Sequence, residues 1–343
     1  DRGDYYEYLA IYVDDILVWG KDLIKTIEKL KGVGRPDFFL GGNVDYLDEH
    51  WNKDGITIGF SAETYIKNLI PKFERLLNCE FKIYNTPMEE NAHPELDESP
   101  FLNEDLSSIY RGITGSLNWL LTLGRFDIAY ATSTLARFNM QPREGHLIHA
   151  RRILGYLKKF GHGRMIFDTG YIDHSQLEFK DQEWKDMYPD AVEDIPHDMP
   201  APKGKPVQLT VYVDADHAHD KVTRRSVTGI ILFGNKTPLK AISKRQKTVE
   251  TSTYGSELVA AKIAVELVMG FRYQLRMLGV NIKGPATMLG DNMSVVLNTT
   301  VPSSSLKKKC NDIAYHRVRE AIAANIINFA HVNSKDNFAD VCT

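Results

Sequence analysis

Four acidic residues in the C-terminal part of this chain stand in sequence settings where acids are uncommon. They are Asp214 in an apolar strand-like run, Glu257 in a stretch of helical spacing, Asp291 directly after another apolar run, and Asp340 on a final helical segment. An unpaired buried carboxylate is very costly, so burial of these side chains requires compensation. Divalent cations provide it, and a pair of such ions can cleave phosphodiesters. The four acids therefore predict a metal centre.

A second acidic pair occurs near the N-terminus, in the string Tyr12-Val13-Asp14-Asp15. Residues 8–19 favour two short strands, and the aspartates would then lie at the tip of a hairpin that a metal can reach. The alternative is that Asp14 and Asp15 are ordinary polar turn residues. Two acidic sites on one chain suggest nucleic-acid chemistry at two places.

The elements expected to position the four C-terminal acids begin at residue 206. The pattern predicts strands over 207–214, 226–234, 237–243, 285–290 and 326–332, and helices over 253–278, 292–298 and 311–324, with a last helical turn near residue 337. Ser252 or Thr253 would cap the first helix, and Asp291 would cap the second as well as bind metal. This order implies a mixed sheet flanked by helices, whose strand ends and helix starts bring the acids to one edge.

The upstream half favours other elements. It predicts a helix over 22–31, strands over 36–60, a helix from an N-cap at Ser61 to about 77, an extended connection over 84–104, and helices over 105–123, 127–138 and 145–160. Residues 168–205 are rich in Asp, Glu and Pro and lack sustained periodicity. We therefore predict three segments: 1–167, an acidic linker at 168–205, and a domain at 206–343.

Composition is that of an ordinary globular protein. The 343 residues suffice for about two domains, with 43% hydrophobic and 25% charged residues. Three scattered cysteines argue against a disulfide framework or structural zinc and favour a reducing, intracellular compartment, cytoplasmic or nuclear. No apolar run reaches the roughly 18 residues of a membrane span, and the N-terminus does not read as a signal peptide. Because the chain lacks an initiator Met, we expect it to be a fragment of a longer protein.

Charge is unevenly distributed along the chain. The net charge is −3, but residues 206–343 carry 18 Lys and Arg against 11 Asp and Glu, a net charge of +7. This basic part is the better candidate for contacts with a phosphate backbone. A solvated Lys-rich surface is the alternative. The candidate contacts are Arg224, Arg225, Lys244, Arg245 and Lys247.

Several C-terminal motifs resemble the ribonuclease H domain of copia-type LTR retrotransposon Pol polyproteins. They are Tyr212-Val213-Asp214-Ala215-Asp216, Arg225-Ser226-Val227-Thr228-Gly229, Ser256-Glu257-Leu258-Val259-Ala260, Asp291-Asn292-Met293-Ser294, and Phe338-Ala339-Asp340. The resemblance implies an α/β (α+β) fold with a ribonuclease H-like mixed five-stranded sheet and flanking helices. It also implies that Asp214, Glu257, Asp291 and Asp340 bind two Mg²⁺ or Mn²⁺ ions and hydrolyse the RNA strand of an RNA–DNA hybrid.

The upstream half is similar to the end of the reverse transcriptase in the same polyproteins. Tyr12-Val13-Asp14-Asp15 resembles the palm motif, and Arg125-Phe126-Asp127-Ile128-Ala129 follows as in these elements. The resemblance implies a partial palm, thumb and connection region, with Asp14 and Asp15 as the remnant of a polymerase site. Polymerisation is not expected from this chain alone. The implied partners are the N-terminal reverse-transcriptase part, supplied separately, or another protein chain.

The sequence departs from the family pattern in places, and the truncated N-terminus, the negative net charge and the acidic linker keep a second hypothesis open. Phe126 replaces a usual proline, Gly255 replaces a common glutamate, and the loop before Asp340 lacks a histidine that many ribonucleases H carry. His331 lies nearby in a strand-like run and is given no role. The alternative is a catalytically silent, element-derived protein that acts as a structural or nucleic-acid-binding component of an assembly. A sequence-specific DNA-binding module is disfavoured, because no helix-turn-helix, zinc or basic-zipper pattern is found.

Overall fold

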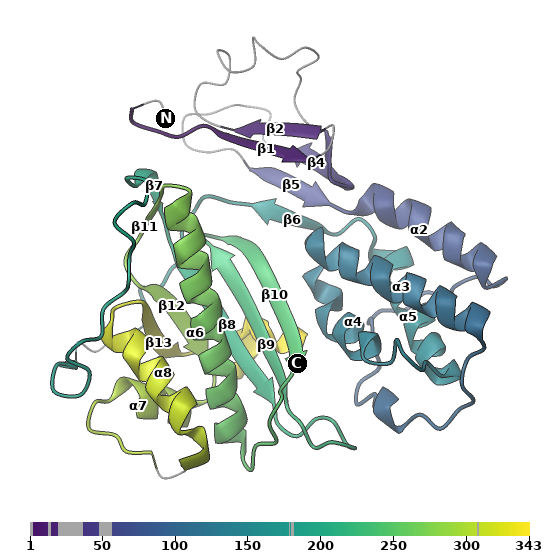
Figure 1. Cartoon of the computed structure of the whole chain (residues 1–343). Coiled ribbons are helices and arrows are strands. Elements are labelled where there is room, and N and C mark those ends of the chain that lie inside the picture. Colours follow the sequence, from purple (N-terminus) through teal and green to yellow (C-terminus); the bar gives the residue numbers. More distant parts are fainter. Residues whose placement is uncertain are drawn as a thin grey trace.

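The structure is a computed structural model that describes residues 3–12, 15–19, 37–47, 57–177, 179, 182–306 and 309–343. Figure 1 shows a helical unit with a small sheet beside a second unit, in which helices pack on a larger sheet. The predicted mixed α/β class is confirmed. Among the described residues, no helix is both long and apolar enough to cross a bilayer.

Two short strands near the N-terminus contain part of the Tyr12–Asp15 motif. Strands β1 (Tyr8–Tyr12) and β2 (Asp15–Trp19) pair antiparallel, with Tyr12 opposite Asp15. The two predicted strands are therefore present, and Asp15 begins the second one. Asp14 and the helix predicted over 22–31 lie outside the described residues.

In the part of the chain that the structure describes, the helical unit joins four α-helices to a four-stranded sheet. The strands are β3 (Phe38–Phe39), β4 (Gly42–Tyr46), β5 (Ile58–Ser61) and β6 (Arg164–Phe167), and the helices are α2 (Glu63–Leu76), α3 (Glu104–Thr122), α4 (Ala129–Ala136) and α5 (Glu144–Phe160). The long helices predicted from 3.6-residue periodicity are confirmed. The apolar residues repeat at this period because they form one face of each helix, and these faces meet in one core around Tyr110, Leu120 and Ile153. The predicted N-cap at Ser61 is wrong: Ser61 ends β5, and Ala62 precedes α2 without a side-chain cap.

The C-terminal unit is built on a five-stranded mixed sheet. Its strands are β8 (Leu209–Asp216), β9 (Val227–Gly234), β10 (Thr237–Arg245), β12 (Ala286–Gly290) and β13 (Ile327–His331), in the spatial order β10-β9-β8-β12-β13. Strands β8, β12 and β13 are parallel, whereas β8, β9 and β10 form an antiparallel meander. The predicted mixed five-stranded sheet with flanking helices is confirmed.

Both faces of this sheet are covered. Helices α6 (Thr253–Met277) and α8 (Asp312–Ala323) bury one face in a large apolar core, and α7 (Met293–Thr300) packs beside them. The other face meets the short 3₁₀ segment η5 (Phe338–Cys342) and helix α4 of the helical unit, where Ala129, Ile231 and Cys342 share a buried cluster. Burial on both faces explains why β8 and β9 read as nearly continuous apolar runs.

The acidic segment expected to be a linker is anchored to the C-terminal unit. Trp184 is buried and its ring lies 4.8 Å from the guanidinium carbon of Arg319 on α8. Glu193 forms an ion pair with Arg272 on α6, at 2.7 Å. The segment then enters β7 (Lys203–Val207), which pairs with β11 (Val280–Ile282). The division of the chain at residues 168 and 206 stays a prediction.

Candidate metal centre

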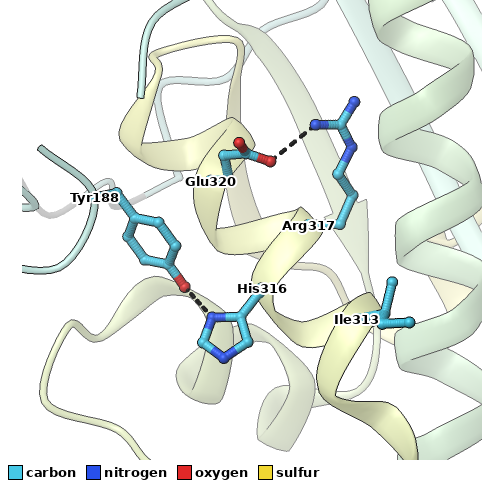
Figure 2. Close-up of a pocket in the computed structure, with 5 residues that line it drawn as sticks. All are labelled: Tyr188, Ile313, His316, Arg317 and Glu320. Atoms are coloured by element: carbon cyan, nitrogen blue, oxygen red, sulfur yellow. Dashed lines mark hydrogen bonds and ion pairs between the residues drawn. The ribbon is translucent and has the colours of Figure 1, made fainter. Parts of the chain in front are cut away.

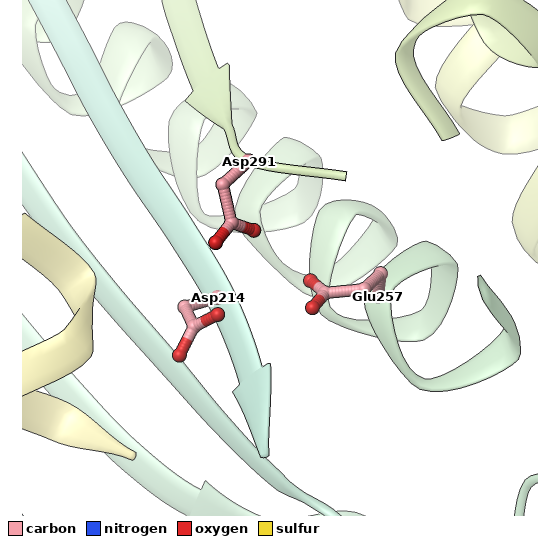
Figure 3. Close-up of side chains that lie close together, drawn as sticks. All are labelled: Asp214, Glu257 and Asp291. Carbon is pink, nitrogen blue, oxygen red and sulfur yellow. The ribbon is translucent and has the colours of Figure 1, made fainter. Parts of the chain in front are cut away.

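Three of the predicted acids converge at one edge of the five-stranded sheet. Asp214 lies near the end of β8, Asp291 follows β12 directly, and Glu257 lies in the second turn of α6 (Figure 3). Each offers a carboxylate oxygen, and these oxygens lie within 4.8 Å of one another. The convergence follows from topology, because parallel strands β8 and β12 end at the same edge and α6 begins there.

Asp340 approaches the same site from η5. It lines one pocket together with Asp214, Asp216 and Asp291. Its segment packs closely on β9, where a side-chain carbon at Gly229 would come within 2.6 Å of the Ala339 carbonyl oxygen. The glycine of the Arg225–Gly229 motif therefore makes room for the segment that carries the fourth acid.

Burial and mutual repulsion shape the electrostatics of these carboxylates. Burial, followed by the charges of Asp214 and Asp291, raises the pKa of Glu257 to about 9. Burial also raises the pKa of Asp214, and burial with the charges of Asp214 and Asp291 raises the pKa of Asp340 to about 6. Such a cluster is strained as a set of anions, and a cation among the oxygens would relieve both desolvation and repulsion. An all-oxygen donor set fits Mg²⁺ or Mn²⁺.

Sequence similarity to transposon proteins agrees with the motifs. No protein-family model matches the chain. The retrovirus-related Pol polyprotein from transposon RE1 of Arabidopsis thaliana is 27% identical over 351 residues, which cover 100% of this chain. The chain is a homologue of transposon Pol polyproteins. A putative transposon Ty5-1 protein of Saccharomyces cerevisiae is 32% identical and covers 55% of the chain.

The match is to a part of longer relatives. The chain spans about a fifth of the RE1 polyprotein, 21% of its length, and 59% of the Ty5-1 protein. Among solved structures, ribonuclease H1 of Halobacterium salinarum aligns with 39% of this chain and 93% of its own, at 15% identity and a TM-score of 0.31. A foamy viral protease-reverse transcriptase, solved with an RNA/DNA hybrid, aligns with 68% of this chain and 27% of its own, at 11% identity and a TM-score of 0.31.

Several groups that hold the acids or the segments beside them were not predicted. The Thr343 hydroxyl donates a 2.5 Å hydrogen bond to Asp214, and the Ser334 hydroxyl donates one of 2.6 Å to Asp291. His331, which received no role from the sequence, ends β13 with its Nε2 atom 3.0 Å from the Asp291 carbonyl oxygen. The Asn337 amide donates to the Val213 carbonyl and ties η5 to β8. The family motifs gave no signal for these partners.

The helix cap predicted at Asp291 is also wrong. The residue that caps α7 is Asn292, whose side chain accepts a hydrogen bond from the Val295 backbone amide, and not Asp291. Asp291 therefore lies just outside the helix, with its carboxylate directed to the other acids (Figure 3). At α6 the predicted cap is present, since the Ser252 side chain accepts from the Gly255 amide.

The predicted basic residues gather at the same sheet edge as the acids. Strand β9 begins opposite Asp216, and β10 ends opposite the start of β9. Arg224, Lys244 and Lys247 are exposed, and Arg225 is half-buried. Arg245 differs from them, because its guanidinium bonds the buried carboxylate of Asp220 at 2.8 Å.

A second pocket lies on α8 and contains none of the predicted residues. It is lined by Tyr188, Ile313, His316, Arg317 and Glu320 (Figure 2). The Tyr188 hydroxyl lies 2.6 Å from Nδ1 of His316, and Arg317 pairs with Glu320 at 2.9 Å. The contact between Tyr188 and His316 further attaches the acidic segment to the C-terminal unit.

Proposed function

We propose that this chain is the C-terminal part of a retrotransposon reverse transcriptase joined to a ribonuclease H domain, and that the domain hydrolyses RNA in RNA–DNA hybrids. The observation that carries the proposal is the convergence of Asp214, Glu257 and Asp291, from three separate elements, to oxygens within 4.8 Å. Similarity to a transposon Pol polyprotein over the whole of this chain, which spans 21% of that polyprotein, supports it.

The acids would hold two divalent cations, Mg²⁺ or Mn²⁺. Asp214, Glu257 and Asp291 form the tight group of ligands, and Asp340 adds a carboxylate from the rim. When bound, such ions activate water and stabilise the leaving 3′-oxygen. The chain itself fixes the ligands: Thr343 orients Asp214, and Ser334 orients Asp291.

The hybrid would be held through its phosphates rather than its sequence. Arg224, Arg225, Lys244 and Lys247 lie at the edge that carries the acids and offer cations to a backbone. Arg245 would contribute mainly by ordering this edge through Asp220. Asp14 and Asp15 are proposed as a palm-motif remnant, and no polymerase activity is proposed for this chain by itself.

Cleavage of a labelled RNA–DNA hybrid in Mg²⁺ and in Mn²⁺ tests the proposal. We expect metal-dependent cleavage that Asp214→Asn lowers by on the order of 10²-fold or more. Asp312→Asn, an exposed acid on α8, is the matched control and should cleave like wild type. Absence of cleavage by a folded chain would instead favour a catalytically silent component of an assembly.

A further inference from the structure

A chain of hydrogen bonds joins the helical unit to the rim of the metal centre. The hydroxyl of Tyr130 on α4 lies 2.7 Å from Nε2 of His219, and Nδ1 of His219 bonds the carboxylate of Asp216. Asp216 in turn lines the pocket that contains Asp214, Asp291 and Asp340. Tyr130 and Asp216 thus belong to different units and are connected by hydrogen bonds through the imidazole of His219.

The chemistry of the three groups sets the direction of both hydrogen bonds. A carboxylate only accepts, so Nδ1 of His219 carries the proton that it donates to Asp216. When the ring is neutral, Nε2 then accepts from the Tyr130 hydroxyl. Burial raises the pKa of Tyr130 to about 12, so this hydroxyl keeps its proton at neutral pH.

The imidazole is held in place by side chains of the helical unit. The Tyr130 ring meets the His219 ring edge-on at a centroid distance of 5.6 Å. The centroid of the His93 ring lies 5.2 Å from that of His219. Only 13% of the His219 side chain is exposed. Next along the chain, the buried Asp220 pairs with Arg137 at the end of α4. The loop that leaves Asp216 is therefore ordered by α4.

Asp216 needs such support because 43% of its side chain is exposed. A carboxylate at a strand end can adopt several rotamers, and a hydrogen bond to one oxygen selects among them. Groups that donate hydrogen bonds to a metal-binding carboxylate, without binding the metal themselves, commonly tune metal affinity. We propose that Tyr130 and His219 are positioning residues that hold Asp216 as a fifth carboxylate of the metal centre, so that the helical unit completes the site. This inference rests on the proposed function.

Mn²⁺ binding by the full chain, followed through the electron paramagnetic resonance signal of the free ion, tests the inference without a substrate. Tyr130→Phe removes one hydroxyl and should weaken Mn²⁺ binding about fivefold, the weight of one hydrogen bond. Tyr156→Phe is the matched control: it also removes one hydrogen-bonded tyrosine hydroxyl of the helical unit, but one that bonds the carboxylate of Asp127. This control should bind Mn²⁺ like wild type.

A double-mutant cycle separates positioning from general destabilisation. In an Asp216→Asn background, Tyr130→Phe should cause no further loss of Mn²⁺ affinity. An equal loss in both backgrounds, or wild-type affinity in Tyr130→Phe, would overturn the inference and leave the proposed function standing. Absence of Mn²⁺ binding in wild type would overturn both.

A second variant guards against misfolding of the first. His219→Phe keeps an aromatic ring but has no N–H to donate, and it should weaken Mn²⁺ binding at least as much as Tyr130→Phe. Wild-type affinity in His219→Phe would overturn the inference regardless of the behaviour of Tyr130→Phe.

Discussion

The carboxylates of Asp214 and Glu257 lie within 4.8 Å of each other, although one residue belongs to a central strand and the other to a helix. Burial keeps water from screening this pair, and the charge of Asp214 adds to the rise in the pKa of Glu257. The metal-free site is therefore a source of instability that cations can remove.

Stability of the metal-free protein should fall as pH rises. Because the pKa of Glu257 is about 9 in the folded chain, the folded state retains a proton that the unfolded state has already released above the usual glutamate pKa. The unfolding free energy then decreases between about pH 5 and pH 9. Urea unfolding in EDTA should show Glu257→Gln to be more stable than wild type near pH 8, by on the order of 1–3 kcal/mol.

The matched control for this experiment is Glu266→Gln on the same helix. Glu266 is half-exposed and pairs with Lys262 on the surface, so its loss should change stability by less than about 1 kcal/mol at every pH. A metal-free pH profile that Glu257→Gln leaves unchanged would contradict the predicted burial of this carboxylate.

Added Mg²⁺ should stabilise the folded chain. A ligand at 100 times its dissociation constant contributes about 2.7 kcal/mol when it binds the folded state alone. Thermal unfolding should therefore shift upward with Mg²⁺ in wild type, and Asp214→Asn should lose most of this shift. Equal shifts in both proteins would mean that Mg²⁺ acts elsewhere.

Asp220 should be important for stability because its carboxylate is buried between two arginines from different units. Arg137 ends α4 and Arg245 ends β10, and both contact the same oxygen. Burial raises the pKa of Asp220, but hydrogen bonds from Thr223 and Arg245 and the charge of Arg137 outweigh it and hold the pKa well below the usual range. Asp220→Ala should lower the unfolding free energy by about 3–5 kcal/mol in urea.

The sign of the pH dependence at Asp220 is opposite to that at Glu257. The stabilisation that Asp220 contributes is present above the usual aspartate pKa. It is lost as pH falls toward the lowered pKa of Asp220 in the folded state. Asp45→Ala is the control, since its pair with Arg164 is nearly half-exposed on both sides and should contribute less than about 1 kcal/mol. If Asp220→Ala and Asp45→Ala lowered the unfolding free energy by similar amounts, the strong contribution expected from the buried Asp220 ion pairs would be refuted.

Trp184 should stabilise the C-terminal unit from within the acidic segment. Its ring covers the guanidinium of Arg319, which is fully buried and also bonds backbone carbonyls of Asn298 and Pro302. Trp184→Ala should lower the unfolding free energy by about 3 kcal/mol. Val192→Ala, in the same segment but 76% exposed, should change it by less than about 0.5 kcal/mol. Equal effects would show that the segment is not docked.

Hybrid binding should depend on salt through the exposed basic residues. Arg224→Ala and Lys247→Ala should each weaken binding and reduce the slope of log K against log salt by about 1, because each would remove one phosphate contact. Lys67→Ala on α2, with 70% of its side chain exposed, should leave both quantities unchanged. Fluorescence anisotropy with a labelled hybrid at several salt concentrations measures the slope, and an unchanged slope in Arg224→Ala would remove this residue from the interface.

Much of the local structure was predictable because it depends on residues close together in the sequence. The period of apolar residues predicts α3 and α5 nearly to their ends, and alternating or continuous apolar runs predict β8, β9 and β12. The errors at Ser61 and Asp291 concern caps. A residue of the right type stands one or two positions from the helix start, and only backbone geometry decides which side chain reaches the free amides.

The sequence by itself determined the types and order of the acids, the helices and strands that carry them, and the kinship with transposon Pol polyproteins. The tertiary structure decided which groups meet: Thr343 with Asp214, Arg245 with Asp220, and Tyr130 with His219. The acidic segment was likewise expected to be a linker, yet Trp184 and Glu193 dock it. The physical reason is distance along the chain, because period and propensity act over one or two turns, whereas these contacts join residues brought together only by packing of whole elements.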